Sequence, residues 1–203
     1  DLAPMADGGP GFVDVLHAAL GGELLAVTVE SPFGTPVPAT ILLADDTAYI
    51  ETAQACGRHL TNDEGVELAT TVGVGELLAA AIDTGASTVV VGLGGSGTND
   101  GGAGLLHALG ATSDSILDCG PHCFVGLTEV DLAPARARVG DTVLVAATDV
   151  DIPLTGLFGA TKTFGPQKGL AEDRLVVVDG WLEDLANATD RRTSLEKGAG
   201  AAG

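Results

Sequence analysis

Two segments of the chain place apolar residues at the spacing of a single helix face. In Phe12–Leu20 they fall at i, i+3, i+4, i+7 and i+8, and Gly21-Gly22 follows. The same spacing occurs in Val74–Ile82, which is followed by Gly85. An apolar stripe ending near glycine is typical of an amphipathic helix and its C-terminus. Both segments are therefore predicted to be helices.

Five short apolar runs, rich in β-branched residues, predict strands. They are 24–29, 39–44, 47–51, 88–92 and 143–147. Only Asp45-Asp46 separates the second run from the third, so these two are predicted to form a hairpin. The prolines and the glycine in Pro32–Pro38 predict a turn-rich connection before that hairpin.

Three further segments complete the predicted order of elements. Ala103–Leu109 is predicted to be a short helix, and the apolar run Leu175–Val178 precedes a predicted helix at Trp181–Ala188. Gln54–Glu67 is polar and has no regular pattern. Helices and strands thus alternate along much of the chain, and the hairpin adds an antiparallel pair. This order favours an α/β fold, a three-layer mixed sheet with helices on both faces.

Composition indicates a sizeable core and narrows the partners. Of the 203 residues, 45% are hydrophobic and only 3% aromatic. We therefore expect a core of Ala, Val, Leu and Ile, as in parallel sheets. The net charge of -19, from 9 basic and 28 acidic residues, argues against nucleic acid and anionic membranes as partners. An anionic small substrate stays open, because a local site can be positive in an acidic protein.

Cysteine usage and apolar run length bear on location. No run approaches the length of a membrane span and no signal peptide is visible, although the chain begins at Asp1 rather than Met. Three cysteines are an odd, sparse set, which indicates a reducing cytosol rather than a disulfide framework. We therefore expect a cytoplasmic protein. Cys119-Gly-Pro-His-Cys123 lacks the spacing of a common zinc knuckle and a second ligand pair, so zinc is not predicted there.

The loop after the run 88–92 carries the most distinctive chemistry. Seven glycines lie from Gly92 to Gly104. The polar residues among them are Ser96, Thr98, Asn99 and Asp100. Open α/β sheets bind ligands at the carboxyl ends of their strands. We therefore place the candidate site in this loop.

Three interpretations of the glycine loop stay open. Its backbone N–H groups suit an anion, and Asp100 beside an anion would bind a cation or take a proton, as phosphoryl transfer to an alcohol requires. Gly92, Gly94 and Gly97 also satisfy the GxGxxG dinucleotide fingerprint. That fingerprint needs a helix that begins by Gly97, whereas residues 99–102 delay any helix. The third interpretation is a turn that only lets a helix pack close to the sheet.

Other polar clusters are further candidates, although no Walker A sequence or protein-kinase signature occurs. Asp7-Gly8-Gly9 forms an acidic turn before the first helix. Asp149 and Asp151 follow the run 143–147, where paired carboxylates suit Mg²⁺. Lys168, in FGPQKG, would neutralise charge on a transferred phosphoryl group, and Lys162 is a second candidate. The alternatives are a simple turn, a solvated strand end and surface charges.

Seven segments, in the same order along the chain, resemble bacterial glycerate kinases of the first type. GLGGSGTNDGGAG followed by LLHALGA (Gly92–Ala111) resembles that family's signature. The other segments are MADGGPG, AYIETA, TVGVGEL, ATDVDIPLTG, FGPQKG and KGAGAAG, of which FGPQKG matches outright. Collinear blocks that cover most of the chain are far more specific than one motif.

The resemblance implies an activity and an architecture. The enzyme would transfer a phosphoryl group from ATP to D-glycerate with Mg²⁺, and 2-phosphoglycerate is the usual product of the bacterial family. The family's architecture is two α/β domains with the site in the cleft between them. We assign residues 1–30 to the remnant of an N-terminal α/β domain and residues 31–203 to a second α/β domain that carries the glycine loop. Association into a homo-oligomer stays open.

The resemblance also suggests residue roles. Asp100 or Asp149 would act as base or Mg²⁺ ligand, Asp151 would be a second metal ligand, and Lys168 would stabilise charge. The residues expected to bind substrate or phosphate are Asp7, Gly8, Gly9, Glu51, Gly94, Gly95, Ser96, Thr98, Asn99, Thr155 and Gln167. Replacement of Asp100 by Asn is predicted to abolish turnover without unfolding the protein.

Departures from the family pattern leave two alternatives open. Gly97 stands in place of alanine, Ile152 in place of an asparagine, and Pro10 in place of a glutamate. The segments that precede the first glycine turn and follow the last block in the family are absent here. One alternative is a catalytically impaired domain that binds an anion or nucleotide. The other is a nicotinamide-dependent oxidoreductase.

Overall fold

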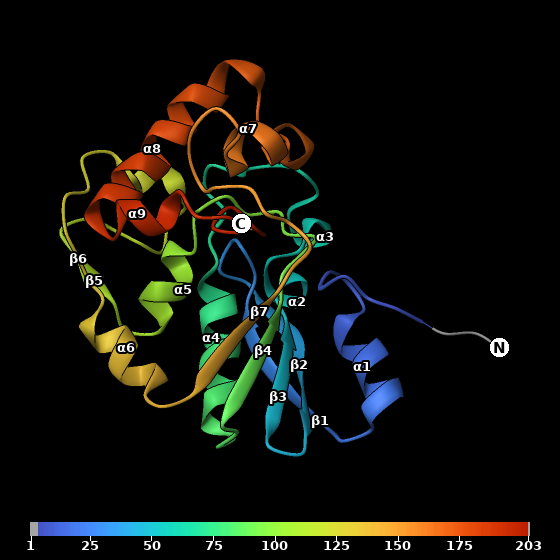
Figure 1. The fold of residues 1–203 in the computed structure, drawn as a ribbon. Coiled ribbons are helices and arrows are strands. Elements are labelled where there is room, and N and C mark those ends of the chain that lie inside the picture. Colours follow the sequence, from blue (N-terminus) through green and yellow to red (C-terminus); the bar gives the residue numbers. More distant parts are fainter. Residues whose placement is uncertain (1–3, 203) are drawn as a thin grey trace.

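A computed structural model describes residues 4–202, and its centre is one mixed five-stranded sheet in the order β1-β2-β3-β4-β7 (Figure 1). β1 and β2, and β2 and β3, pair antiparallel, whereas β3, β4 and β7 run parallel. Their bounds are β1 Glu23–Glu30, β2 Pro36–Ala44, β3 Thr47–Glu51, β4 Thr88–Gly92 and β7 Val143–Ala147. The predicted strands, the hairpin and the mixed sheet are confirmed.

The start of β2 differs from the prediction of a turn-rich connection. Pro36 and Pro38 lie in the strand and pair with Glu30 and Thr28 of β1. The partner on the other side, β3, reaches only Leu42–Ala44 of β2. The proline-containing part of β2 is therefore paired on one side only, a position where a residue without an N–H group is tolerated.

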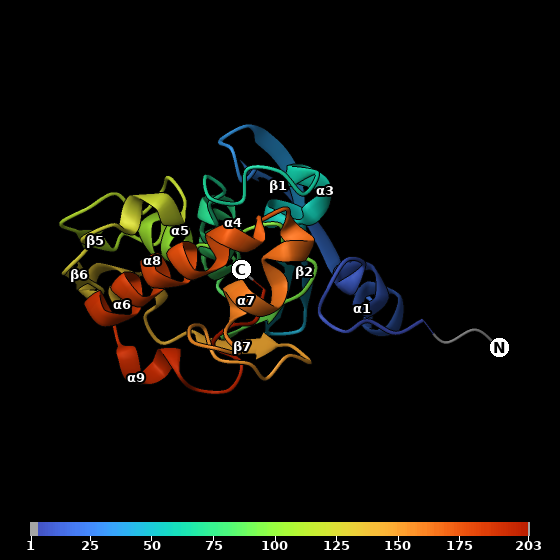
Figure 2. The same cartoon turned by 90° about the horizontal axis from the view of Figure 1, so that it is seen from above.

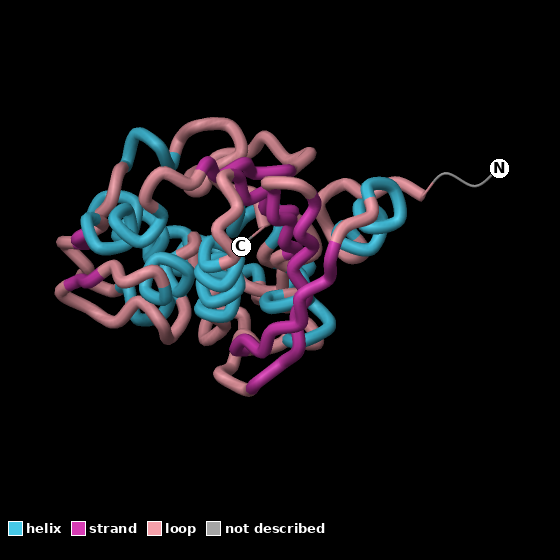
Figure 3. Tube along the Cα trace, turned by 90° about the horizontal axis from the view of Figure 1, so that it is seen from below, coloured by secondary structure: helices cyan, strands magenta, loops and turns pink. Residues whose placement is uncertain are grey.

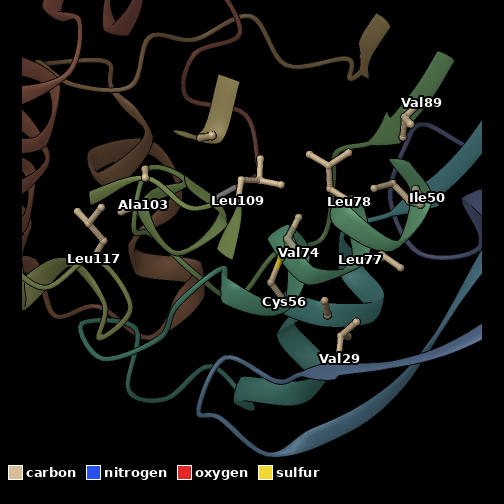
Figure 4. Packing of buried hydrophobic residues seen from close by; sticks show 14 of the residues in the cluster. Val29, Ile50, Cys56, Val74, Leu77, Leu78, Val89, Ala103, Leu109 and Leu117 are labelled. Atoms are coloured by element: carbon tan, nitrogen blue, oxygen red, sulfur yellow. The ribbon is translucent and has the colours of Figure 1, made fainter. Parts of the chain in front are cut away.

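Helices cover both faces of the sheet, as predicted. On one face α1 (Phe12–Leu20) packs Phe12 and Val13 against Leu42. On the other face α4 (Val72–Asp83) packs against the alternate residues of the strands, which include Ile41 and Ile50. Figure 3 shows the strands between these two helices, and Figure 4 shows the α4 side of the core. Because side chains alternate along a strand, neighbouring residues 41 and 42 serve opposite layers.

The segment that follows β7 forms a helical layer above the carboxyl ends of the parallel strands (Figures 1 and 2). It contains α7 (Ala160–Phe164), the short helices η2 (Pro166–Lys168) and η3 (Glu172–Arg174), α8 (Leu175–Ala188) and α9 (Arg191–Ser194). α8 begins at Leu175 rather than at the predicted Trp181. The apolar run 175–178 is helical because Val178, Leu182 and Leu185 bury one face against the core.

The remaining elements lie between β3 and α4 and between β4 and β7 along the chain. Gln54–Glu67, which has no regular sequence pattern, contains α2 (Ala53–Cys56) and α3 (Arg58–Thr61). The predicted short helix is α5 (Ala103–Ala108). Beyond it lie β5 (Thr112–Ser113), η1 (Pro121–Phe124), β6 (Val130–Asp131) and α6 (Ala133–Val139). Within residues 4–202, no helix is both long and apolar enough to cross a membrane.

The structure bears on the expected state of the cysteines but not on the expected domain division. Cys119 and Cys123 form a disulfide, so the expectation of free thiols is wrong for these two, whereas Cys56 is free and buried. The two cysteines are four positions apart, and the turn at η1 brings them together. The division into residues 1–30 and 31–203 stays a prediction. Residues 1–3 of the first part and Gly203 of the second lie outside the described residues.

Candidate functional site

A cavity of about 320 Å³ opens where the loops after β4 and β7 meet the N-terminal turn and η2. Eight predicted residues line it: Asp7, Gly9, Gly94, Gly95, Ser96, Asp149, Gln167 and Lys168. Its other lining residues are Pro10, Arg58, Leu93, Val150, Phe164 and Ala202. The cavity therefore lies at the carboxyl ends of the parallel strands, where α/β sheets bind their ligands.

The two glycine turns form one wall of this cavity because their backbones touch. A Cβ on Gly8 would lie 2.4 Å from the carbonyl oxygen of Ala147, and Gly8 has φ +94°. A Cβ on Gly94 would lie 2.8 Å from the Cα of Gly9. Side chains at these positions would push apart the N-terminal turn, the glycine loop and the end of β7. Glycine is thus required here for close backbone approach.

The segment that joins α2 and α3 holds the glycine loop through two backbone hydrogen bonds. Gly97 N–H donates to the carbonyl of Cys56 at 2.7 Å, and Arg58 N–H donates to the carbonyl of Gly95 at 3.0 Å. The helix after the loop, α5, begins only at Ala103. The dinucleotide fingerprint needs a helix that begins by Gly97, so the nicotinamide hypothesis is not supported by this geometry.

Lys168 is the buried cation of the cavity. Its side chain reaches from η2 under the glycine loop, and only 3% of the residue is exposed. The ammonium donates to Ser96 Oγ at 3.0 Å and to the carbonyl of Thr98 at 2.6 Å. Burial lowers the pKa of Lys168 to about 8. Because both partners are neutral oxygens, the charge is available for an anion in the cavity.

Arg58 is a second cation at the cavity, and sequence reasoning missed it. Its guanidinium donates to both carboxylate oxygens of Asp63 at 2.7 Å and is partly exposed. Asp63 holds the pKa of Arg58 above its ordinary value through these hydrogen bonds. No motif marks Arg58, because it stands in a polar segment with no regular pattern. Only its contact with the glycine loop reveals it.

The predicted acidic residues separate into two groups. Asp7 and Asp149 both line the cavity, and Asp7 Oδ1 accepts the N–H of Gly9 at 3.0 Å. Asp151 is not among the lining residues. It pairs with Lys197 at 2.7 Å, and this hydrogen bond lowers the pKa of Asp151. Asp7, rather than Asp151, is therefore the carboxylate that shares the cavity with Asp149. The metal role of Asp149 and Asp151 stays a prediction.

Asp100 is fully buried beneath the loop and does not line the cavity. Its carboxylate accepts the N–H of Thr71 at 2.8 Å, of Gly102 at 3.1 Å and of Gly104 at 3.2 Å, and also the hydroxyl of Thr71. Burial raises the pKa of Asp100, against the opposing effect of these donors. One carboxylate thus joins the N-termini of α4 and α5. This supports a positioning role, and catalysis by Asp100 stays a prediction.

Five more predicted residues lie outside the cavity lining: Gly8, Glu51, Thr98, Asn99 and Thr155. Glu51 accepts the N–H groups of Gly11 and Val13 and so anchors the start of α1. Asn99 donates through Nδ2 to the hydroxyl of Thr161 at 2.9 Å. Thr98, Asn99 and Thr155 are buried.

Lys162, the second lysine candidate, also lies away from the cavity. It forms an ion pair with Asp179 and donates to the carbonyl of Gly156. Its charge is neutralised there, so it joins α7 to α8 rather than facing a ligand.

Comparison with known proteins assigns the chain to a family. The sequence profile of the "Glycerate kinase family" matches residues 1–203. The chain belongs to the glycerate kinase family. The resemblance seen in the sequence is thereby confirmed at the level of the family.

Individual relatives extend the same likeness. A glycerate kinase of Bacillus subtilis (strain 168) is 41% identical over 212 residues, and a glycerate 2-kinase of Escherichia coli (strain K12) is 37% identical. Each alignment covers 98% of this chain and 56% of the relative. A crystal structure of a protein assigned as glycerate kinase 2 from Salmonella typhimurium LT2 superposes with a TM-score of 0.89 at 35% identity. It is covered over 57% of its length, and this chain over 98%. The chain thus spans about half the length of these relatives.

Proposed function

We propose that the protein containing this chain transfers the γ-phosphoryl group of ATP to D-glycerate, with 2-phosphoglycerate as the product. The observation that carries this proposal is the buried Lys168 ammonium, which has two neutral partners and faces a cavity with two carboxylates. Phosphoryl transfer needs positive charge near the transferred group and an acceptor for the hydroxyl proton. The cavity contains both.

The residues of the cavity divide this chemistry between them. Lys168 and the N–H groups of the glycine loop would hold the anionic end of a ligand, and Arg58 adds charge at the rim. Asp7 or Asp149 would accept the proton of the attacking hydroxyl group of glycerate. The oxygen then bonds to the γ-phosphorus as the bond to ADP breaks. Which hydroxyl group reacts depends on how the glycerate carboxylate is held.

The two carboxylates also fit the metal that the family implies. Asp7 and Asp149 supply hard oxygen donors in one cavity, which Mg²⁺ prefers, and Mg²⁺ usually keeps several waters and binds the nucleotide phosphates. Bound there, Mg²⁺ would neutralise charge on the phosphate oxygens. Lys168 and Arg58 would then bind the remaining phosphate or carboxylate oxygens.

A coupled assay of ADP release that requires D-glycerate tests the proposal, and phosphorus NMR identifies the phosphorylated hydroxyl. Lys168→Met is expected to lose most of the activity, whereas Lys197→Met, a change at a lysine exposed to 83%, serves as the matched control. Calorimetry on the same samples distinguishes the outcomes. Binding of ATP or glycerate without turnover would favour the impaired binding domain. If the protein shows no binding and no turnover, the assignment of this cavity is refuted.

A further inference from the structure

A cluster of sulfur and imidazole groups lies on η1 and on the turn just before it, away from the residues that line the proposed phosphoryl-transfer cavity. Cys119, His122 and Cys123 each offer a ligand atom, and these three atoms lie within 4.8 Å of one another. All three residues are partly exposed, so small ions in solvent have access to them. In the structure the two sulfur atoms are joined as a disulfide.

The imidazole of His122 is held in a defined tautomer. Its Nδ1 lies 3.0 Å from the carbonyl oxygen of Glu67, which only accepts hydrogen bonds, so Nδ1 carries the proton. The lone pair of neutral His122 is therefore on Nε2, and Nε2 lies 3.3 Å from Cys123 Sγ. Histidines that bind metals are fixed in this way, with one ring N–H given to a backbone carbonyl and the other nitrogen left for the ion.

Glu67, whose carbonyl fixes His122, is also bound through its side chain. The side chain of Glu67 accepts two hydrogen bonds from Arg174, at 2.9 and 2.7 Å, and the Arg174 guanidinium lies 5.3 Å from the centre of the Trp181 ring. On the other side, the hydroxyl of Ser115 donates to the carbonyl of Cys123 at 2.8 Å. His122 and Cys123 are thus each held by a hydrogen bond before any ion binds.

The spacing of the three atoms suits a tetrahedral ion once the disulfide is open. Zinc–sulfur and zinc–nitrogen bond lengths place two ligand atoms about 3.5 to 3.8 Å apart in a tetrahedral site. The Nε2–Sγ distance at Cys123 already approaches this value. The distance between the two sulfur atoms would increase by about 1.7 Å, a change that rotation of the two side chains achieves without movement of the turn. Water would complete the fourth position.

We propose that Cys119, His122 and Cys123 form a redox-gated site for a thiophilic cation such as Zn²⁺. A dithiol reductant gives two electrons and two protons to the disulfide and becomes a disulfide itself, which leaves two thiols on the protein. Binding of the cation then releases both thiol protons, and each sulfur and Nε2 donates an electron pair to the ion. The oxidised protein has no thiolate to offer and does not bind.

Cobalt titration of the whole chain tests this proposal, because thiolate-to-Co²⁺ charge transfer gives a near-ultraviolet absorption band. The protein is reduced with dithiothreitol, freed of it without air and titrated with Co²⁺, and Zn²⁺ then displaces the cobalt. We expect one ion per reduced chain and none in the oxidised chain. No charge-transfer band in the reduced protein, or an equal band in the oxidised protein, would overturn the proposal.

Variants assign the ligands. Cys119→Ser is expected to abolish the band, and His122→Ala to weaken Zn²⁺ affinity by at least about tenfold. His59→Ala, at an exposed histidine, and Cys56→Ala, at the buried thiol, are matched controls that should bind as the parent does. Circular dichroism confirms that each variant is folded. Unchanged affinity in folded His122→Ala, or loss of the band in Cys56→Ala, would refute the ligand set.

Discussion

The carboxylate of Asp100 provides a quantitative test of how the candidate site is supported. Three backbone N–H groups, from Thr71, Gly102 and Gly104, donate to it in a fully buried position. Replacement of Asp100 by Ala leaves these donors without their partner. A buried unsatisfied donor costs about 1–3 kcal/mol. With some relaxation of the loop, we expect Asp100→Ala to lower the free energy of unfolding by roughly 3–5 kcal/mol.

Asp100→Asn should cost much less. Each carboxylate oxygen accepts at least one backbone N–H, so an amide keeps the better-bonded side, toward Thr71 and Gly104, and loses only the N–H of Gly102. Burial also raises the pKa of Asp100, which means that a neutral group is tolerated there. We therefore expect a loss of only about 1–2 kcal/mol for Asn.

Urea unfolding followed by circular dichroism measures both variants. With a slope of about 2 kcal/mol per molar urea, Asp100→Ala should shift the midpoint by roughly 2 M. Asp149→Ala, at an exposed carboxylate of the cavity, is the matched control and should stay within about 0.5 kcal/mol of the parent. An Asp100→Ala midpoint close to that of the parent would refute the reasoning. Turnover of folded Asp100→Asn separates the two roles of this residue. Retained turnover would limit Asp100 to positioning, and lost turnover would support the predicted catalytic role.

Three further predictions follow from the contacts described above. An anion needs the charged form of Lys168, and burial lowers the pKa of Lys168 to about 8. The phosphate affinity measured by calorimetry should therefore fall as the pH rises through that value, by up to about tenfold per pH unit. A flat profile would argue that Lys168 does not contact the anion. Arg58→Met should raise the phosphate dissociation constant about three- to tenfold. Asp63→Asn, which frees the guanidinium of Arg58, should not raise it. Equal affinities for Arg58→Met and the parent would limit Arg58 to a structural role. Glu51→Ala removes the acceptor for two N–H groups at the start of α1 and should lower the free energy of unfolding by about 2–3 kcal/mol. Glu51→Gln should lower it by less than half of that, as measured by urea unfolding. Similar losses in both variants would contradict the acceptor role.

Much of the architecture was predictable because its signals are local. Apolar periodicity located α1 and α4, and β-branched runs located the sheet. The start of β2 was missed because proline normally interrupts a strand, and only the one-sided pairing explains its presence. α8 was cut short because β-branched residues favour strands in isolation, whereas burial of Val178 against the core decides for a helix.

The candidate site was predictable only in part, because a motif does not say which way a side chain faces. Asp149 and Asp151 are two positions apart, yet only Asp149 lines the cavity, and Asp151 pairs with Lys197 from a distant segment. Arg58 belongs to no motif and reaches the cavity through the fold. The roles of Asp100 and Glu51 as acceptors for helix N-termini are likewise tertiary facts. The sequence shows where a carboxylate stands in the chain. The N–H groups around it in the fold determine whether it anchors a helix or faces the cavity.

The buried thiol of Cys56 makes the glycine loop accessible to kinetics. Its sulfur lies beneath the loop, its carbonyl accepts the N–H of Gly97, and burial raises its pKa to about 12. A thiol reagent can therefore react only when the loop lifts away from α2. With the Cys119–Cys123 disulfide intact, the labelling rate of this single thiol reports the free energy of that local opening. A ligand that closes the cavity would slow the labelling in proportion to its occupancy.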